Sequence, residues 1–332
     1  MTRFLNDQAK LVYIWESGTY GNPSGNGVWP GLVQSHEITE MVNVIQTRFL
    51  GQGNRNIGRY DDGPLDVEGT ITLFPQDWRF IGLALGSIGQ SSTALNFANH
   101  FAEVNGGQRM SPNVSGYFNP WTSFSLEESR TGNVTNKNSV RTIRGCVPNE
   151  VTLNITQGEP IEMQVGFIGQ IGSWFSGATT TVTAGSNRPY MWSDTTFQLP
   201  QGTTMEPVKS LNLTITNNFE RAHYINGSQT TQVPYPLNRD YTLEITQDLD
   251  ANVVGSLYNS FFQGGSLFNC VLDIDSSSAV VGSHRLNMTF SGCIITEMSE
   301  PVEVGGISEV SYTIMALSGA GSAWDRYAYT LF

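Results

Sequence analysis

The stretch "RTIRGCVPNEVTLNITQGEPIEMQVGF", residues 141–167, determines the expected fold because its pattern returns at residues 288–314, "MTFSGCIITEMSEPVEVGGISEVSYTI". Cys146 and Cys293 lie 147 residues apart, and other identities keep that spacing. These are Gly145 with Gly292, Glu150 with Glu297, Gly158 with Gly305, and Glu162 with Glu309. Self-similarity at a long fixed spacing is typical of repeated architectures. The chain is therefore predicted to consist of two related halves.

A second similarity precedes the first one along the chain. Residues 66–87, "DVEGTITLFPQDWRFIGLALGS", resemble residues 240–260, "DYTLEITQDLDANVVGSLYNS", with Thr72 aligned to Thr246. Each half follows the same order: a strand, a long polar loop, a strand, a short helix, a strand, a strand with the Gly-Cys pair, and a final strand. Chance similarity between two β-rich halves is the alternative to duplication.

The repeated segments alternate apolar and polar residues. In residues 67–73, apolar side chains and Gly69 occupy every second position. The same period of two runs through residues 151–155, 163–167, 241–246 and 310–314. Such strands belong to antiparallel sheets with one buried face. The expected fold is mainly β, with two tandem antiparallel β-sandwich or barrel domains, each flanked by one short α-helix.

Two short helices are expected, one in each half. Pro75 suits the first turn of a helix, and an apolar stripe at helical spacing follows it. That stripe consists of Trp78, Ile81, Leu85 and Ile88. The second helix is expected to start near Asp248 or Asp250, since either residue is a candidate N-cap. Its apolar residues are Val254, Leu257, Tyr258 and Phe261.

The domain boundaries follow from these elements. The prediction is an N-terminal arm or loop at 1–31, a first domain at 32–175 with an insertion at about 90–120, a linker at 176–206, a second domain at 207–318 and a C-terminal arm at 319–332. Glycine and turn-forming residues dominate 16–31, which favours an extended loop there. The C-terminal segment is aromatic, and exposed aromatic ends need a partner surface.

The composition favours a protein that is covered by other protein and does not bind DNA tightly. Charged residues make up 14% of the chain, against about 25% in soluble domains, and interface cores are depleted in charge. The net charge of −12 opposes tight nucleic-acid binding, which needs basic residues to displace counterions. The three cysteines, an odd and sparse set, indicate buried free thiols rather than a disulfide framework. No segment is predicted to span a membrane.

No catalytic or metal-binding motif is recognisable, so neither an enzyme nor a cofactor is expected. The four histidines lack the spacing of a metal site. Glu127 and Glu128 are neighbours on a predicted strand and point to opposite faces, which is poor geometry for acid–base work. Asp273 and Asp275 lack the glycine and distal glutamate of a calcium loop. A solvated turn is therefore favoured over an ion site there.

Two long polar loops occupy equivalent places in the halves. The first, residues 51–63, carries Arg55, Arg59, Asp61 and Asp62. The second, residues 225–240, carries Tyr235 and Arg239. Loops of this length in a compact domain are usually functional or disordered. Contact with a neighbouring molecule and a hairpin without a partner are both compatible with the mixed charge.

The segment "VEGTITLFPQDWRFIGLAL", followed by a Gly-Cys-x(3)-Glu strand and a final alternating strand, resembles the major tail tube proteins of long-tailed, siphovirus-like viruses. The resemblance covers residues of about 32–170 and 207–317. It implies a structural virion protein of the phage tail, made in the host cytoplasm, in which six tube domains form a ring and stacked rings form a hollow tube for DNA. A chain with two such domains implies a trimeric, pseudo-hexameric ring.

The resemblance also implies partners and roles for particular residues. The partners are further copies of the chain, other tail proteins such as the tape measure and the tail terminator, and passing DNA that is not bound specifically. The two polar loops become candidates for contacts between rings. The candidates for lining the lumen are the paired Glu162 and Glu309, followed by Glu68 and Glu244. An outward, solvent-facing position remains the alternative for these four.

Other functions are considered beside this one. A carbohydrate-binding or adhesin protein would gather exposed aromatic residues on one face, whereas Trp15, Trp29, Trp121 and Trp174 are scattered in sequence. An enzyme on a β-sandwich would need a nucleophile or metal constellation that the sequence does not offer. Tube subunits of related injection machines, including contractile tails, are not separated from a non-contractile tail by sequence.

Overall fold

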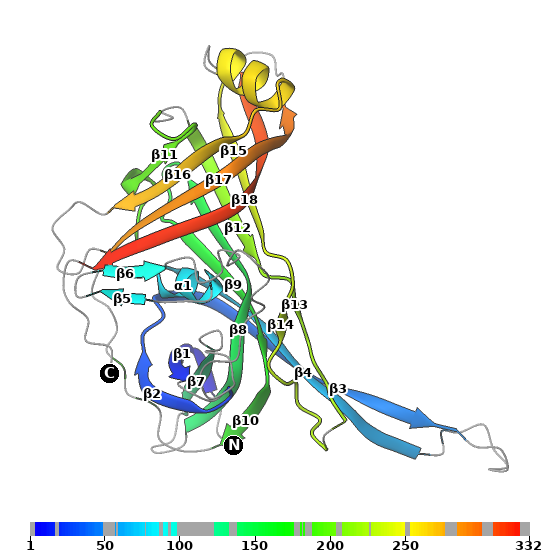
Figure 1. Cartoon of the computed structure of the whole chain (residues 1–332). Coiled ribbons are helices and arrows are strands. Elements are labelled where there is room, and N and C mark those ends of the chain that lie inside the picture. The colour runs from blue at the N-terminus through cyan, green and yellow to red at the C-terminus, as the bar shows by residue number, and fades with distance from the viewer. Residues whose placement is uncertain are drawn as a thin grey trace.

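The computed structural model describes residues 4–16, 20–48, 57, 59–76, 78–85, 89–91, 94–97, 123–132, 138–175, 180, 182, 188–203, 208–225, 227–249, 253–275, 284–300 and 308–325. The strands are β1 (Phe4–Glu16), β2 (Pro23–Val28), β3 (Leu32–Thr47), β4 (Arg59–Phe74), β5 (Gly89–Ser91), β6 (Ala94–Phe97), β7 (Phe124–Gly132), β8 (Asn138–Thr156), β9 (Glu162–Gly169), β10 (Ile171–Phe175), β11 (Thr195–Gln198), β12 (Val208–Thr216), β13 (Phe219–Glu220), β14 (Tyr235–Pro236), β15 (Asp240–Asp248), β16 (Phe268–Asp275), β17 (His284–Ser299) and β18 (Glu309–Asp325). The helices are α1 (Arg79–Leu85), the 3-10 helix η1 (Trp192–Asp194) and the π-helix η2 (Val253–Gln263). The prediction of a mainly β, antiparallel fold is confirmed (Figure 1).

One long sheet runs through both halves of the chain. Its strand order is β3-β4-β9-β8-β12-β15-β18-β17-β16-β11, and every neighbouring pair is antiparallel. At β8 the sheet forks: the first part of the strand pairs with β7, and the part from Val147 onward pairs with β9. Strand β8 therefore belongs to two layers, and the core of the first half lies between them.

The Gly-Cys pair marks a kink on each of the two long strands β8 and β17. Gly145 has φ 65° and Gly292 has φ 64°, a left-handed conformation that costs glycine nothing. At each kink the backbone N–H of the glycine donates to a side chain, and the accepting residue differs between the halves. The Gly145 N–H donates to Glu16 over 2.7 Å, and the Gly292 N–H donates to Asn269 over 3.2 Å. The repeated dipeptide thus encodes a bend in the strand.

Replacing Gly145 with alanine is expected to destabilise the fold more than the same change at Gly158. Both glycines have positive φ, so each substitution costs about 1–2 kcal/mol of backbone strain. The new Cβ at Gly145 would also lie 2.7 Å from atoms of Gln170 and Tyr20, whereas nothing lies within 4 Å at Gly158. Overpacking adds about 1–3 kcal/mol at Gly145 alone. Denaturant unfolding of both variants checks this, and equal losses would contradict it.

The two halves share strand register as well as strand order. Thr72 lies opposite Gln164 between β4 and β9, and Thr246 lies opposite Ser311 between β15 and β18. The register shifts also correspond: Pro148/Glu150 with Ile295/Glu297, and Val33/Ser35 with Val208/Ser210. All these positions keep the spacings of 147, 174 or 175 residues between the halves.

The core of the first half is packed around α1. Every residue of α1 is buried, and Phe80 contacts Tyr13 and Phe124 with ring centroids 5.5 and 5.6 Å apart. Phe124 in turn contacts Phe167 of β9 at 6.2 Å. The helix thus covers the apolar face of the long sheet, because strands β1, β7 and β9 meet on the same aromatic cluster. The opposite face is polar, and it is called the open face here because described side chains on it, such as Glu68 and Glu244, are exposed.

The structure differs from the predicted boundaries at three places. Residues 1–31 were expected as an arm or loop, but β1 lies inside the sheet beside β7, and its residues 11–14 are buried. An unbroken apolar run of this kind suits a strand buried on both faces and shows no alternation. The linker contains β11, which pairs with β16, and β18 continues through the expected C-terminal arm to Asp325. The second helix is a π-helix, and Ile88 of the first stripe lies outside the described residues.

Candidate functional site

The open face of the long sheet is polar across six neighbouring strands. Glu162 of β9 lies opposite Asn154 of β8, Asn154 opposite Asn212 of β12, and Asn212 opposite Glu244 of β15. The amide of Asn154 donates to Glu162 over 3.3 Å, and that of Asn212 donates to Glu244 over 3.4 Å. Residues directly opposite one another share a face. Two of the predicted lumen candidates therefore lie in one row of side chains on this face.

The open face carries an excess of carboxylates. By register they are Glu37, Asp66, Glu68, Glu150, Glu162, Asp240, Glu244, Asp248, Glu297 and Glu309. Lys209 lies 2.6 Å from both Asp248 and Glu309, and hydrogen bonds to these two groups raise the pKa of Lys209. All four predicted glutamates are on this face, although Glu309 is paired with a cation. No group of three or more metal ligands occurs in the described part of the chain.

The two halves meet where β8 pairs with β12. Residues Glu150–Thr156 of β8 run antiparallel to Ser210–Thr216 of β12, and the hydroxyls of Thr152 and Thr214 are 3.4 Å apart. Below this pairing a small apolar cluster joins Val147, Ile168 and Phe219. The sheet is therefore continuous from one half to the other, and the junction has its own buried contact.

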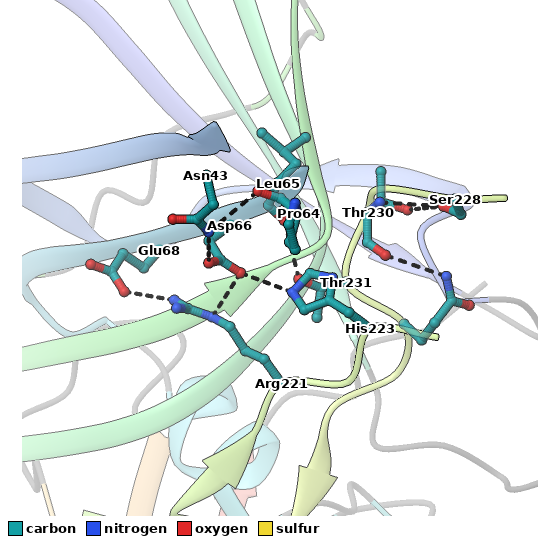
Figure 2. A network of polar contacts seen from close by, with 11 residues as sticks. Asn43, Pro64, Leu65, Asp66, Glu68, Arg221, His223, Ser228, Thr230 and Thr231 are labelled. Carbon is teal, nitrogen blue, oxygen red and sulfur yellow. Dashed lines mark hydrogen bonds and ion pairs between the residues drawn. The ribbon is translucent and has the colours of Figure 1, made fainter. Parts of the chain in front are cut away.

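The loop after β12 also braces the base of the β3–β4 hairpin (Figure 2). Asp66 of β4 lies 3.1 Å from His223 and 3.8 Å from Arg221, and Arg221 contacts Glu68 at 2.6 Å. The backbone N–H of Leu65 donates to the carbonyl of Gln229 over 2.8 Å. Side chains of the second half thus fix the direction of a hairpin that belongs to the first half.

A hydrogen-bond motif at this hairpin occurs in both halves. Asn43 donates to Asp66 over 2.9 Å and to the carbonyl of Pro64 over 3.3 Å. Asn218 donates to Asp240 over 2.7 Å and to the carbonyl of Asn238 over 3.0 Å. Asn43 and Asn218 are 175 residues apart. The sequence analysis missed this pair, although the shared spacing could have identified it.

Two strand edges of the long sheet are unpaired at positions equivalent to the junction between β8 and β12. In the described residues β3 pairs only with β4, and the Ile294–Ser299 part of β17 pairs only with β18. Exposed apolar side chains gather near these edges: Met41, Val42, Val44 and Ile45 on the hairpin, and Ile294 and Met315 on β17 and β18. Open strand edges with apolar neighbours are templates for association. The hairpin projects from the body of the molecule, as Figure 1 shows.

The predicted loop candidates do not form one group. Arg55 lies outside the described residues, as does most of the tip between β3 and β4. Arg59 forms an exposed ion pair with Asp61 at 2.6 Å, and Asp62 lies opposite Val44. Tyr235 is in β14. Arg239 points inward and donates to the buried Asn217 over 2.7 Å, which satisfies a polar group at the junction rather than reaching outward.

The other acidic candidates are held by structural partners. Asp273 and Asp275 lie on β16 and not in a turn, and Arg285 of β17 binds Asp273 through two hydrogen bonds. Glu127 is buried and accepts from Thr180. Glu128 is 2% exposed, with Arg130 at 2.5 Å and His36 of β3 at 3.3 Å. Arginine and histidine partners of this kind neutralise carboxylates without creating a catalytic pair.

Glu128 is expected to contribute to acid stability. Burial acts to raise the pKa of Glu128, but hydrogen bonds and charges of His36 and Arg130 outweigh it and hold the pKa below the usual glutamate value of 4.5. A depressed pKa gives stability that is present above the unfolded value of 4.5 and is lost as the pH falls through the folded value. Glu128→Gln should therefore flatten the loss of stability below about pH 4.5. Unfolding titrations between pH 7 and pH 3 measure this, and an unchanged profile would refute it.

Comparison with known protein families gives a match over most of the chain. A family model described as phage tail tube protein matches residues 8–316, a span that includes both halves, the junction and both open edges. No curated protein matches the chain. In the described residues no helix is long and apolar enough to cross a membrane.

Proposed function

The chain belongs to the phage tail tube protein family, and from this premise we propose that three copies close into a ring and that stacked rings form the tube of a long, non-contractile viral tail. Each chain supplies two tandem tube domains, so three chains give the six domains of one ring. The role is structural, without catalysis.

The junction between β8 and β12 is the observation that carries this proposal. It joins the Gly-Cys strand of one domain to the first repeated strand of the next inside a single chain. The equivalents of those two strands are β17 and β3. In the described residues, Ile294–Ser299 of β17 and all of β3 have a partner strand on one side alone. A surface that meets a different surface of an identical copy generates either a ring or a filament. Repeating the internal junction between chains closes the ring and pairs both of these edges.

The internal register specifies the pairing between chains. Glu150 lies opposite Thr216, and Thr152 lies opposite Thr214. The equivalent residues of the proposed junction between chains are Glu297 opposite Met41 and Ser299 opposite Thr39. In each pair the first residue belongs to β17 of one chain and the second to β3 of the next. A pairing shifted by one residue is excluded, because it would move the buried apolar side chains of a strand to the solvent face.

The open face is proposed to line the channel. In the described residues, α1 and the second layer of strands cover the opposite face of the first half, whereas the carboxylate-rich face is free to bound a lumen. Glu162 and Glu244 would repel phosphate groups, which allows DNA to pass without being bound. Glu68 and Glu309 share this face, but Arg221 and Lys209 offset their charges. The hairpin with Arg59, Asp61 and Asp62 is proposed to reach toward the next ring. The tape measure and tail terminator proteins are proposed partners, with assembly in the host cytoplasm.

Electron microscopy of concentrated purified protein tests this function. Hollow tubes or stacked rings with a central channel are expected. A chain that remains monomeric at all concentrations and salt conditions would overturn the proposal. Glycan binding by that monomer would favour the adhesin alternative.

A further inference from the structure

The apolar cluster at the internal junction is buried. Val147 of β8, Ile168 of β9 and Phe219 of β13 are 1%, 7% and 9% exposed. Phe219 comes from the second half, and the two residues that receive it come from the first. Its backbone N–H donates to the side chain of Asn149 over 2.8 Å, which fixes the chain at this point. The first half therefore offers a socket and the second half supplies the residue that fills it.

The equivalent positions one repeat away are all apolar and all exposed. Val147 corresponds to Ile294 and Ile168 to Met315 at the spacing of 147, and Phe219 corresponds to Val44 at the spacing of 175. Ile294, Met315 and Val44 are 38%, 44% and 49% exposed. These spacings are the ones that relate the register shifts and the Asn43 and Asn218 motifs. The three residues equivalent to the buried cluster are thus apolar but exposed.

The side-chain volumes of the two sets compensate in part. Ile294 is larger than its equivalent Val147, Met315 is close in volume to Ile168, and the inserted Val44 is smaller than Phe219. Apolar contacts tolerate exchanges of similar volume. Met315 also follows Glu309, Ser311 and Thr313 on the open face of β18, so the face changes from polar to apolar at the socket.

Val44 cannot reach Ile294 and Met315 of its own chain. Strands β3 and β17 are at the two ends of an eight-strand run, with β4, β9, β8, β12, β15 and β18 between them. Seven spacings of about 4.8 Å separate them by roughly 34 Å along the sheet. The residue that fills the socket must therefore come from another molecule.

We propose that Ile294 and Met315 form an apolar socket that receives Val44 from the β3–β4 hairpin of a second copy of this chain. The inference rests on the proposed ring and adds a contact that strand pairing alone does not require. The ion pair between Arg221 and Glu68 has no counterpart in this contact, because the equivalent residues are Gln46 and Thr242. Burial of apolar surface is thus the main attraction at this socket.

Disulfide trapping with two double variants tests the socket. Val44→Cys with Met315→Cys places one thiol on the hairpin and one in the socket. Phe219→Cys with Ile168→Cys is the matched control, since these residues already touch within one chain. The native cysteines are buried, so each single variant reports background labelling and cross-linking. Both pairs are oxidised at concentrations where wild-type protein is assembled and where it is monomeric.

The expected result is that the control pair links within one chain under both conditions. The Val44 and Met315 pair should link separate chains, with a three-chain species as the limit, in assembled protein only. Single Met315→Cys should react with maleimide at least tenfold more slowly when assembled. Assembled tubes with no interchain link and unchanged labelling would overturn the socket and leave the ring intact. Absence of any wild-type assembly would instead defeat the proposed function.

Discussion

When Thr39 and Ser299 are both replaced by cysteine, oxidation of assembled protein should yield a covalently closed species of three chains. The expectation follows from the internal junction, where the equivalent residues Thr214 and Thr152 have hydroxyls 3.4 Å apart on paired strands. Two sulfur atoms at neighbouring positions of this kind are within reach of a disulfide after small side-chain rotations. Non-reducing electrophoresis should show the three-chain band replacing the single-chain band almost completely.

A matched intrachain variant shows whether a failure to cross-link comes from the register between chains or from the disulfide geometry of these positions. Thr152→Cys with Thr214→Cys tests whether this pair of positions accepts a disulfide at all, and it should lose two thiols without changing chain number. If that control links and the Thr39 and Ser299 variant stays single-chain in assembled protein, the register between chains is wrong. A ladder that extends beyond three chains would show an open filament instead of a closed ring.

Phe80→Ala is expected to lower the free energy of unfolding by about 3–5 kcal/mol. Phe80 is 2% exposed and packs between Tyr13 and Phe124, so its removal leaves a cavity where α1, β1 and β7 meet. The aromatic pairs add attraction beyond the buried area. Because α1 holds the two layers of the first half together, the loss should appear in unfolding and also in assembly, through a smaller folded fraction.

Guanidinium unfolding of monomeric protein measures this loss. Tyr258→Ala on η2 is the matched aromatic control, since Tyr258 is 42% exposed, and it should cost less than about 1 kcal/mol. Similar losses for Phe80→Ala and Tyr258→Ala would show that α1 is not the centre of the core. A large loss at Tyr258 would place the main contact at η2.

The strand pattern and the Gly-Cys repeat could be read from sequence because both reflect local constraints. Alternation predicted β4, β9, β15 and β18, since each has one buried and one open face. The Gly-Cys pairs recur because each strand bends there with positive φ. The shared face of the four predicted glutamates follows from the same alternation, combined with the register.

The features that sequence did not predict depend on contacts between distant segments. β1 was missed because the run Leu11–Ile14 is apolar on both faces and lacks alternation. The inward direction of Arg239 depends on Asn217, a buried partner that becomes visible only when the halves are joined. The brace on Asp66 by Arg221 and His223 links residues more than 150 positions apart. No local pattern carries that information.

A helical reconstruction of the assembled tube by electron cryomicroscopy would show how the chains are arranged in each ring. We expect three chains in each ring, β17 of one chain paired with β3 of the next, and Glu162 and Glu244 facing the channel. Six chains in each ring, or a channel bounded by the layer that contains β1 and β7, would contradict it.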